Sequence, residues 1–81
     1  MKNVIVRQVA KAIKGRRCAL GLSQEELAHR SGLDRTYISG VERGVRNITL
    51  HSLERILDAL EWPADDFFGQ LSKVPREADH D

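Results

Sequence analysis

Side chains that can hydrogen-bond to DNA bases lie close together between residues 35 and 40. Arg35 can donate two parallel hydrogen bonds to one guanine, and Thr36 can hydrogen-bond a base edge or contact a thymine methyl group. Tyr37 carries a phenol that can reach a phosphate, Ser39 follows one helical turn after Arg35, and Gly40 allows close approach of its backbone. This composition is typical of the first turns of a helix that lies in the major groove.

A second group of side chains could contact the phosphate backbone as the chain leaves that helix and the next one begins. Its members are Arg43, Arg46, Asn47, Thr49 and Ser52. In a plainer interpretation, Arg35 and Arg43 are solvated helix arginines and Tyr37 packs at the edge of the domain. Asn47 and Thr49 are then only a turn residue and a helix cap.

These side chains need a rigid frame, and residues 23–44 predict two short helices joined by a tight turn. Ser23, followed three residues later by Glu26, predicts a capping box at the first helix. Gly32 suits the positive φ of the turn, Asp34 is a natural N-cap for the second helix, and Gly44 falls at its left-handed C-terminal position. The apolar inner face consists of Leu27, Ala28, Leu33, Ile38 and Val41. This layout is a helix-turn-helix.

The same stretch is similar to a known family. The matching segments are Gly21–Ala28, Gly32–Leu33, Tyr37–Ser39 and Glu42–Gly44. They resemble the phage-repressor and Cro-type helix-turn-helix (XRE) family, and the resemblance covers roughly residues 6–71. The run from Asp34 to Asn47 is most similar to the controller proteins of restriction–modification systems, although it is common in other bacterial members. The resemblance implies that Gln24 meets a backbone phosphate and that Arg17 pairs with Glu42.

The residues before this stretch predict a helix from about Asn3 to Leu20. Its apolar side chains recur at spacings of three and four residues, at Val6, Val9, Ala10 and Ile13. Gly15 weakens the helix interior. Arg16 stands where members of the family usually have an apolar residue, so we expect Leu20 or Cys18 to fill the core there.

Two more helices are predicted after a short connection at residues 45–47. Thr49 caps the first of them, and its wide apolar stripe consists of Leu50, Leu53, Ile56, Leu57 and Leu60. Trp62 and Pro63 end that stripe, and Pro63 suits the start of the next helix, whose Asp65 and Asp66 suit a helix N-terminus. The sequence therefore predicts an all-α, compact five-helix bundle over residues 1–72 and a flexible tail over residues 73–81.

Charge divides the chain into two halves. Residues 1–47 contain ten Lys or Arg and four Asp or Glu, a formal charge of +6. Residues 48–81 contain three Lys or Arg and eight Asp or Glu, a formal charge of −5. A basic half that contains the helix-turn-helix is what a phosphate-facing surface requires, although an ordinary charged surface remains an alternative.

The rest of the composition favours a small cytoplasmic protein that is not an enzyme. The 81 residues contain no apolar run as long as a membrane span, and the N-terminus lacks the pattern of a signal peptide. One cysteine, Cys18, fits a reducing compartment. The histidines, His29, His51 and His80, have no metal-ligand spacing. We therefore expect no metal, cofactor, catalytic residue or small-molecule ligand.

These observations predict a sequence-specific transcriptional regulator that binds double-stranded operator DNA as a homodimer, because one small module covers little DNA. Apolar side chains in the acidic half exceed what a small core can cover and predict the dimer interface. They are Ile56, Leu60, Trp62, Phe67, Phe68 and Leu71. A restriction–modification controller, a phage or plasmid repressor and an autoregulating antitoxin all fit this description. A protein-interaction module without DNA binding is the alternative from another class.

Overall fold

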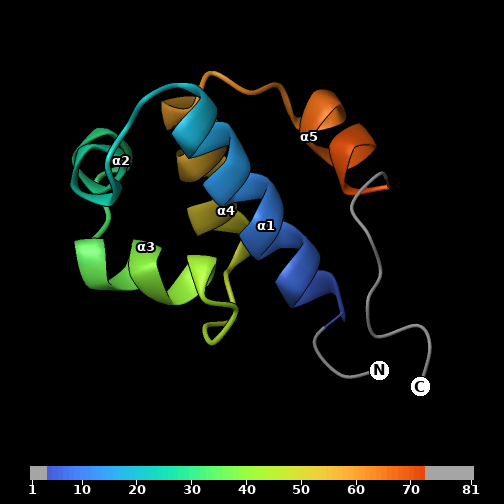
Figure 1. Cartoon of the computed structure of the whole chain (residues 1–81), viewed down its shortest axis with the longest axis horizontal. Coiled ribbons are helices and arrows are strands. Elements are labelled where there is room, and N and C mark those ends of the chain that lie inside the picture. The colour runs from blue at the N-terminus through green and yellow to red at the C-terminus, as the bar shows by residue number, and fades with distance from the viewer. Residues whose placement is uncertain (1–3, 73–81) are drawn as a thin grey trace.

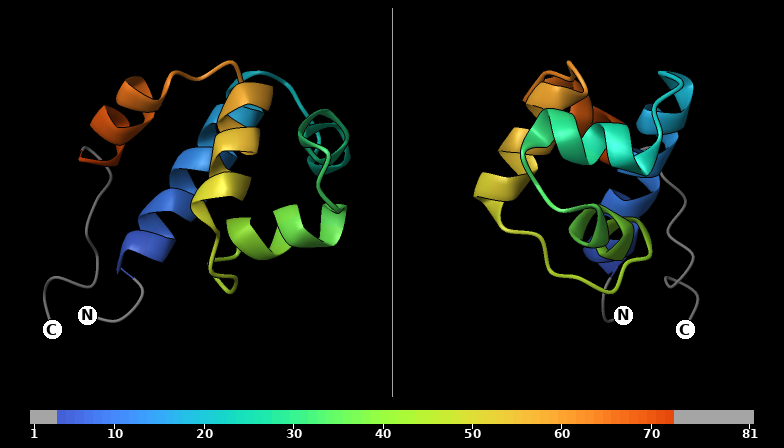
Figure 2. Two further views of the ribbon diagram at one scale, coloured as in Figure 1. Left: turned by 180° about the vertical axis from the view of Figure 1, so that it is seen from behind. Right: turned by 90° about the vertical axis from the view of Figure 1, so that its left-hand side faces the viewer.

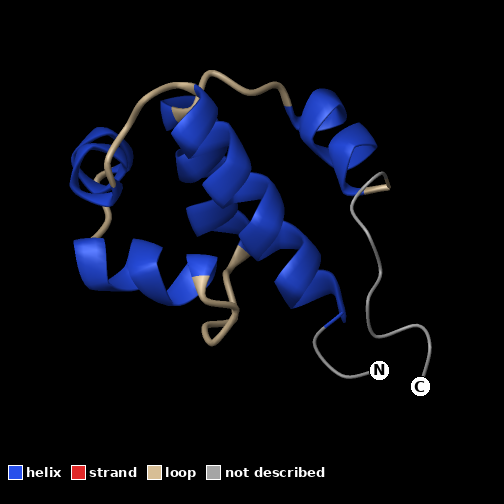
Figure 3. Cartoon of the chain, in the orientation of Figure 1, coloured by secondary structure: helices blue, strands red, loops and turns tan. Residues whose placement is uncertain are grey.

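The computed structural model describes residues 4–72, and these residues form five helices and no strand (Figure 3). The helices are α1 (Val4–Ala19), α2 (Gln24–Ser31), α3 (Arg35–Glu42), α4 (Leu50–Ala59) and α5 (Ala64–Leu71). The predicted all-α bundle of five helices is confirmed. The expected helix start at Asn3 and the expected tail at residues 73–81 lie outside the described residues.

The helices place the predicted helix-turn-helix at one end of the molecule. α1 and α4 occupy the middle, α2 and α3 lie at one end, and α5 lies at the other (Figure 1). α2 packs on α3 and α4, α3 packs on α1, and α5 packs on α1 and α4. The side view shows α2 and α3 crossing steeply (Figure 2). Ala28, which is only 5% exposed, supplies the small side chain that such a crossing needs.

The helix N-termini follow the predicted caps in two cases out of three. The Ser23 hydroxyl accepts from the Glu26 N–H at 2.9 Å, and the Ser23 N–H donates to the Glu26 carboxylate at 2.8 Å, which completes the capping box. Thr49 caps α4 by accepting from the Ser52 N–H at 3.0 Å. Asp34 occupies the N-cap position of α3, but its side chain makes no capping hydrogen bond. That helix start therefore depends on tertiary packing more than on its cap.

Four helices end in the same pattern, in which two backbone N–H groups bond back across the last turn. After α1, α2 and α3 the left-handed residue is a glycine: Gly21, Gly32 and Gly44, with φ of 72°, 71° and 72°. After α4 it is Glu61, with φ of 52°. The Glu61 N–H bonds to the Asp58 carbonyl at 3.1 Å. A side chain at this conformation costs free energy that glycine avoids, so the end of α4 is the strained one.

The core joins all five helices. Its fully buried side chains are Ile13, Leu27, Ile38, Ile56, Leu60 and Phe67. Burying a side chain of this size contributes about 1.5–3 kcal/mol relative to leaving it exposed. Ile56, Leu60 and Phe67 were predicted to form the dimer interface, and that prediction is wrong because each is 0% exposed within its own chain. A side chain with no accessible surface cannot contact a second copy.

The end of α1 also differs from the prediction. Leu20 is 42% exposed and Cys18 is exposed, so neither fills the core beside Arg16. Arg16 itself covers the site, with its guanidinium carbon 5.5 Å from the centre of the Trp62 ring. The aliphatic stem of an arginine can cover apolar surface while its charged head finds polar partners, and this is what allows Arg16 at that position.

Candidate nucleic-acid interface

α3 separates its core-facing side chains from its outward ones. Ile38 and Val41 are 0% and 2% exposed and belong to the core. Arg35 and Thr36, in the first turn, are exposed, and Ser39 is half-buried. The structure therefore brings the predicted base-contacting residues Arg35, Thr36 and Ser39 to the outer side of a helix whose inner side is fixed.

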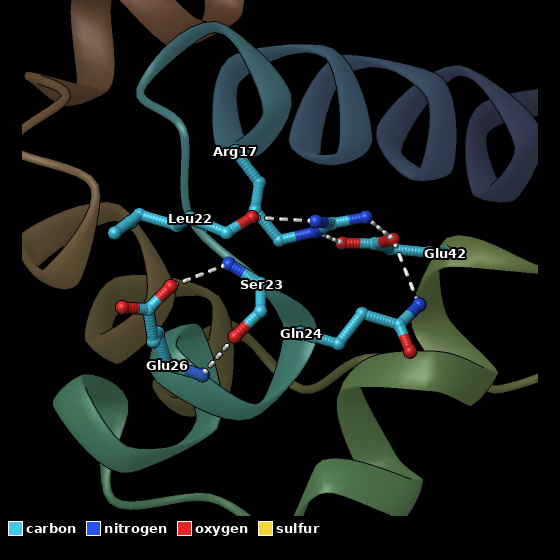
Figure 4. Close-up of polar contacts among 6 residues, drawn as sticks. All are labelled: Arg17, Leu22, Ser23, Gln24, Glu26 and Glu42. Carbon is cyan, nitrogen blue, oxygen red and sulfur yellow. Dashed lines mark hydrogen bonds and ion pairs between the residues drawn. The ribbon is translucent and has the colours of Figure 1, made fainter.

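The position of α3 is held by a bidentate ion pair with the end of α1 (Figure 4). Arg17 Nε donates to Glu42 Oε2 at 2.6 Å, and Arg17 Nη2 donates to Glu42 Oε1 at 2.9 Å. The Arg17 side chain is 11% exposed and that of Glu42 is 2% exposed. The third donor, Nη1, bonds to the Leu22 carbonyl at 2.7 Å. The pairing that the resemblance implied for Arg17 and Glu42 is present, and it ties α1 to the last turn of α3.

This arrangement favours the charged form of Arg17. The hydrogen bond to Glu42 raises the pKa of the Arg17 guanidinium above its ordinary value, although burial acts in the opposite direction. Two close, nearly parallel hydrogen bonds between a guanidinium and a carboxylate are the strongest geometry available to such a pair. The Arg17 guanidinium therefore stays charged in the folded protein.

Gln24 joins the same network rather than pointing freely outward. Its Nε2 donates to Glu42 Oε1 at 3.1 Å, so the first residue of α2 is linked to the last residue of α3 (Figure 4). One amide hydrogen is used in this bond, and the second is left for another acceptor. The half-buried Gln24 is thus held in place beside the recognition helix, and its contact with phosphate stays a prediction.

Tyr37 and Gly40 both lie against Arg46 within this face. The Tyr37 hydroxyl is buried without a hydrogen-bond partner, and the Arg46 guanidinium carbon lies 5.0 Å from the centre of its ring. Gly40 is buried, and a Cβ there would approach Arg46 Cβ and Nε at 3.4 Å. Gly40 therefore lies in contact with the connection after α3, and the predicted close approach of its backbone to DNA stays a prediction.

The connection between α3 and α4 carries most of the predicted phosphate contacts. It runs along the same side of the molecule as the last turn of α3 (Figures 1 and 2). Arg43, Arg46 and Asn47 are exposed along it, Thr49 is exposed at its end, and Ser52 is half-buried in the first turn of α4. These groups follow one another from the last turn of α3 to the first turn of α4, and their contact with phosphate stays a prediction.

The sequence matches the Helix-turn-helix family over residues 13–67, which is more than half of the chain. The chain belongs to the helix-turn-helix family. The control protein C.MunI of Mycoplasma sp is 37% identical over 73 residues, which span 90% of this chain and 99% of C.MunI.

A solved structure of the restriction–modification controller protein C.Esp1396I superposes with a TM-score of 0.82 at 48% identity, covering 84% of this chain and 88% of that one. One chain from the structure of the C.Esp1396I tetramer in complex with its natural 35 base-pair operator superposes with a TM-score of 0.81 at 48% identity, covering 84% of this chain and 90% of that one. A hypothetical transcription factor of Neisseria meningitidis serogroup B is 58% identical over 40 residues, which span 49% of this chain and 38% of that protein.

Arg55 also positions the helix-turn-helix, and the sequence analysis did not identify it. Its Nε donates to the Ser31 carbonyl and its Nη2 to the Gly32 carbonyl, both at 3.0 Å. Arg55 lies in α4, so it links the turn after α2 to the middle of the molecule. Carbonyls at a helix end lack partners within their own helix, and a guanidinium is well suited to both of them. No spacing in the sequence signals a contact over 24 residues.

A groove of about 510 Å³ lies between α4 and α5. Its lining includes Leu50, Leu57, Trp62 and Phe68. Leu50 is 81% exposed and Phe68 is 54% exposed, whereas Trp62 and Leu71 are half-buried. Trp62, Phe68 and Leu71 keep accessible surface as predicted, and Leu50 is an exposed apolar residue that the prediction assigned only to a helix stripe.

Other kinds of site find no support within residues 4–72. No three His, Cys, Asp or Glu side chains in that range come together to hold a metal ion. None of the helices there has the length and apolar character needed to cross a membrane. His29 and His51 are exposed, and His80 lies outside the described residues.

Proposed function

We propose that this protein is the controller of a restriction–modification system, a transcriptional regulator that binds a symmetric operator as a homodimer. The outward first turn of α3 carries the proposal, because it presents Arg35 and Thr36 on a frame that Arg17 and Glu42 hold. Supporting it, this chain is 48% identical to a controller protein whose tetramer was solved on its operator. In this role the protein acts in the cytoplasm, on DNA, without catalysis and without a cofactor or small-molecule ligand.

The proposed contacts fall into two classes. Arg35 reads a guanine and Thr36 and Ser39 contact neighbouring base edges, because they lie on the outer side of α3. The residues proposed to contact phosphate are Gln24, Arg43, Arg46, Asn47, Thr49 and Ser52. Tyr37 can add a contact only if its hydroxyl, which is buried in the free protein, becomes accessible. Phosphate contacts set affinity and register, and base contacts set specificity.

The homodimer would form through the groove between α4 and α5, with a second copy of this chain as the occupant. The accessible apolar surface there comes from Leu50, Trp62 and Phe68, and Leu71 lines a second groove that Leu50 and Phe68 share. Exposed apolar side chains gathered at one face are typical of an interaction surface. In a two-fold dimer each copy supplies one α3, and a palindromic operator offers one half-site to each.

Gel mobility shift with the DNA upstream of the gene, against a scrambled duplex, tests the proposal. We expect the wild-type protein and Lys14→Met, a variant with one fewer exposed charge, to prefer the upstream DNA. Arg35→Ala should lose that preference. Equal, weak binding of the wild-type protein to both duplexes would favour an interaction module instead. Neighbouring genes for a restriction enzyme and a methyltransferase would distinguish a controller from an antitoxin or a phage repressor.

Analytical ultracentrifugation at tens of micromolar tests the homodimer. We expect a dimer for the wild-type protein and a shift toward monomer for Phe68→Asp, which places a charge at the exposed edge of the groove. Leu20→Asp, at an exposed apolar residue that lines neither this groove nor the surface beside Phe68, is the matched control and should stay dimeric. A monomeric wild-type protein at these concentrations would contradict the proposed assembly.

A further inference from the structure

Arg16 and Arg17 are adjacent in α1, yet their side chains reach opposite ends of the fold. Arg17 bonds to Glu42 at the end of α3. Arg16 reaches the turn between α4 and α5, where its Nε and Nη2 donate to the Leu60 carbonyl at 3.3 and 3.2 Å. Its Nη2 also donates to the Glu61 carbonyl at 3.1 Å. One turn of α1 therefore contacts both the recognition helix and the turn that leads into α5.

The two carbonyls that Arg16 binds belong to the strained end of α4. The backbone N–H groups of Glu61 and Trp62 close that turn by bonding to Asp58 and Leu57. Carbonyls that follow the last helical turn have no partner within the helix. Glu61 has a φ of 52°, whereas α1, α2 and α3 have glycine at this position, so the turn after α4 gains more than those three from an external donor.

The same turn sets the position of the apolar groove. Trp62 lies under the Arg16 guanidinium, and its ring meets Phe67 edge-on with 5.1 Å between ring centres. Phe67 in turn meets Phe68 at 5.1 Å. Trp62 and Phe68 line the groove between α4 and α5. Because the three rings are in contact, a movement of Trp62 would shift Phe67 and then Phe68, which lies at the exposed edge of α5.

We propose that Arg16 is a positioning residue for the homodimer: it holds the turn after α4 and the Trp62 ring so that α4 and α5 present one surface to the second copy. This inference rests on the proposed homodimer through the groove. Arg16 itself does not line the groove. It acts through the Leu60 and Glu61 carbonyls and through Trp62, so its removal changes the shape of the surface without removing any side chain from it.

Sedimentation equilibrium of wild-type protein, Arg16→Met and Lys14→Met tests this role. Methionine keeps an apolar stem over Trp62 but has no donor for the two carbonyls. We expect Arg16→Met to weaken dimerisation roughly tenfold, and Lys14→Met, the loss of an exposed charge in the same helix, to leave it unchanged. Trp62 is the only tryptophan in the chain, so its fluorescence in dilute monomer should also change in Arg16→Met alone.

Two comparisons separate positioning from general stability. Glu42→Gln weakens the other contact of the same turn of α1 and should lower the melting temperature without changing the dimer dissociation constant. Arg16→Lys keeps one donor and should fall between the wild-type protein and Arg16→Met; it decides the question if Arg16→Met fails to fold. A dimeric wild-type protein with unchanged dimerisation in Arg16→Met or Arg16→Lys would overturn this inference alone. A monomeric wild-type protein would overturn the proposed homodimer as well.

Discussion

The recognition end of the molecule and the α5 end are attached to the same turn of α1 by different interactions. At the recognition end, Arg17 and Glu42 form an ion pair whose side chains are 11% and 2% exposed. At the α5 end, Arg16 is half-buried and bonds to neutral backbone carbonyls. The first contact joins two full charges away from water, and the second joins one charge to dipoles at the surface.

This difference sets how each end should respond to change. A buried charge that loses its partner keeps its desolvation penalty, so the recognition end depends on both members of its pair. A half-buried guanidinium can exchange its carbonyl partners for water at little cost. We therefore expect mutations at the recognition end to act on folding, and mutations at the α5 end to act mainly on the shape of the surface.

The largest expected effect is the loss of the buried pair. Arg17→Ala or Glu42→Ala should each lower the free energy of unfolding by about 3–5 kcal/mol, because each leaves the other charge unpaired. The double variant should lose much less than the two single losses added together. Thermal and denaturant melting of the three variants measures this, and strictly additive losses would contradict a coupled pair.

The second-largest effect distinguishes a residue that sets DNA specificity from a residue that sets DNA affinity, both at the recognition end. Arg35→Ala should remove about 1–3 kcal/mol of preference for the operator over random DNA, because a base contact is lost. Arg43→Ala should weaken binding to both DNAs equally and reduce the slope of log affinity against log salt by about 0.9. Fluorescence anisotropy at several salt concentrations measures both quantities. Full operator preference in Arg35→Ala would show that α3 is not the reading helix.

A smaller effect tests the strained turn at the α5 end. Glu61→Gly should raise the free energy of unfolding by up to about 1 kcal/mol, because glycine adopts the φ of 52° without steric cost. The contacts of Arg16 remain, since they are to backbone carbonyls. Gly21→Ala is the matched reverse change, because its φ is 72° and no atom lies within 4 Å of the added carbon. Gly21→Ala should lower the free energy of unfolding. Melting experiments should therefore show changes of opposite sign for the two variants, and changes of the same sign would contradict strain at Glu61.

The smallest effect concerns pH at the start of α2. Hydrogen bonds from the Ser23 N–H and, to a lesser extent, from its side chain hold the pKa of the Glu26 carboxyl below its ordinary value. Since the folded pKa is the lower one, the capping box contributes stability above the ordinary pKa and loses it as pH falls through the folded pKa. NMR titration of Glu26 should show the lowered pKa. Ser23→Ala should restore it only in part, because the backbone donor remains; complete restoration would contradict the order of the two causes.

Local sequence patterns were sufficient to predict much of the structure at the recognition end. The capping box needs only Ser23 and Glu26 three residues apart, and the turn needs a glycine at Gly32; both signals lie within one helical turn. The inward positions of Ile38 and Val41 follow from helical spacing alone. The Arg17–Glu42 pair came from resemblance to a family, since no pattern within the chain relates two residues 25 apart.

The interface residues were harder to predict because a helix stripe says which side chains are apolar, not which neighbour covers them. Leu50 and Leu53 belong to the same stripe, yet one is 81% exposed and the other 6% exposed. Ile56 and Phe67, which were predicted at the interface, are likewise fully buried in the core. An apolar residue is buried in the core or left for a partner according to how much of its helix the neighbouring helices cover. That coverage depends on how all the helices pack together.

By itself, the sequence determined the five helices, the helix-turn-helix turn and the basic charge of the half that contains it, because caps, spacing and composition act over short distances. Only the tertiary structure decided that Arg16 covers the Trp62 ring, that Arg55 donates to the Gly32 carbonyl, and that Arg46 packs against Gly40. Long side chains such as arginine have several possible partners within reach. Their choice is made by carbonyls and rings from distant segments, which come together only when the chain has folded.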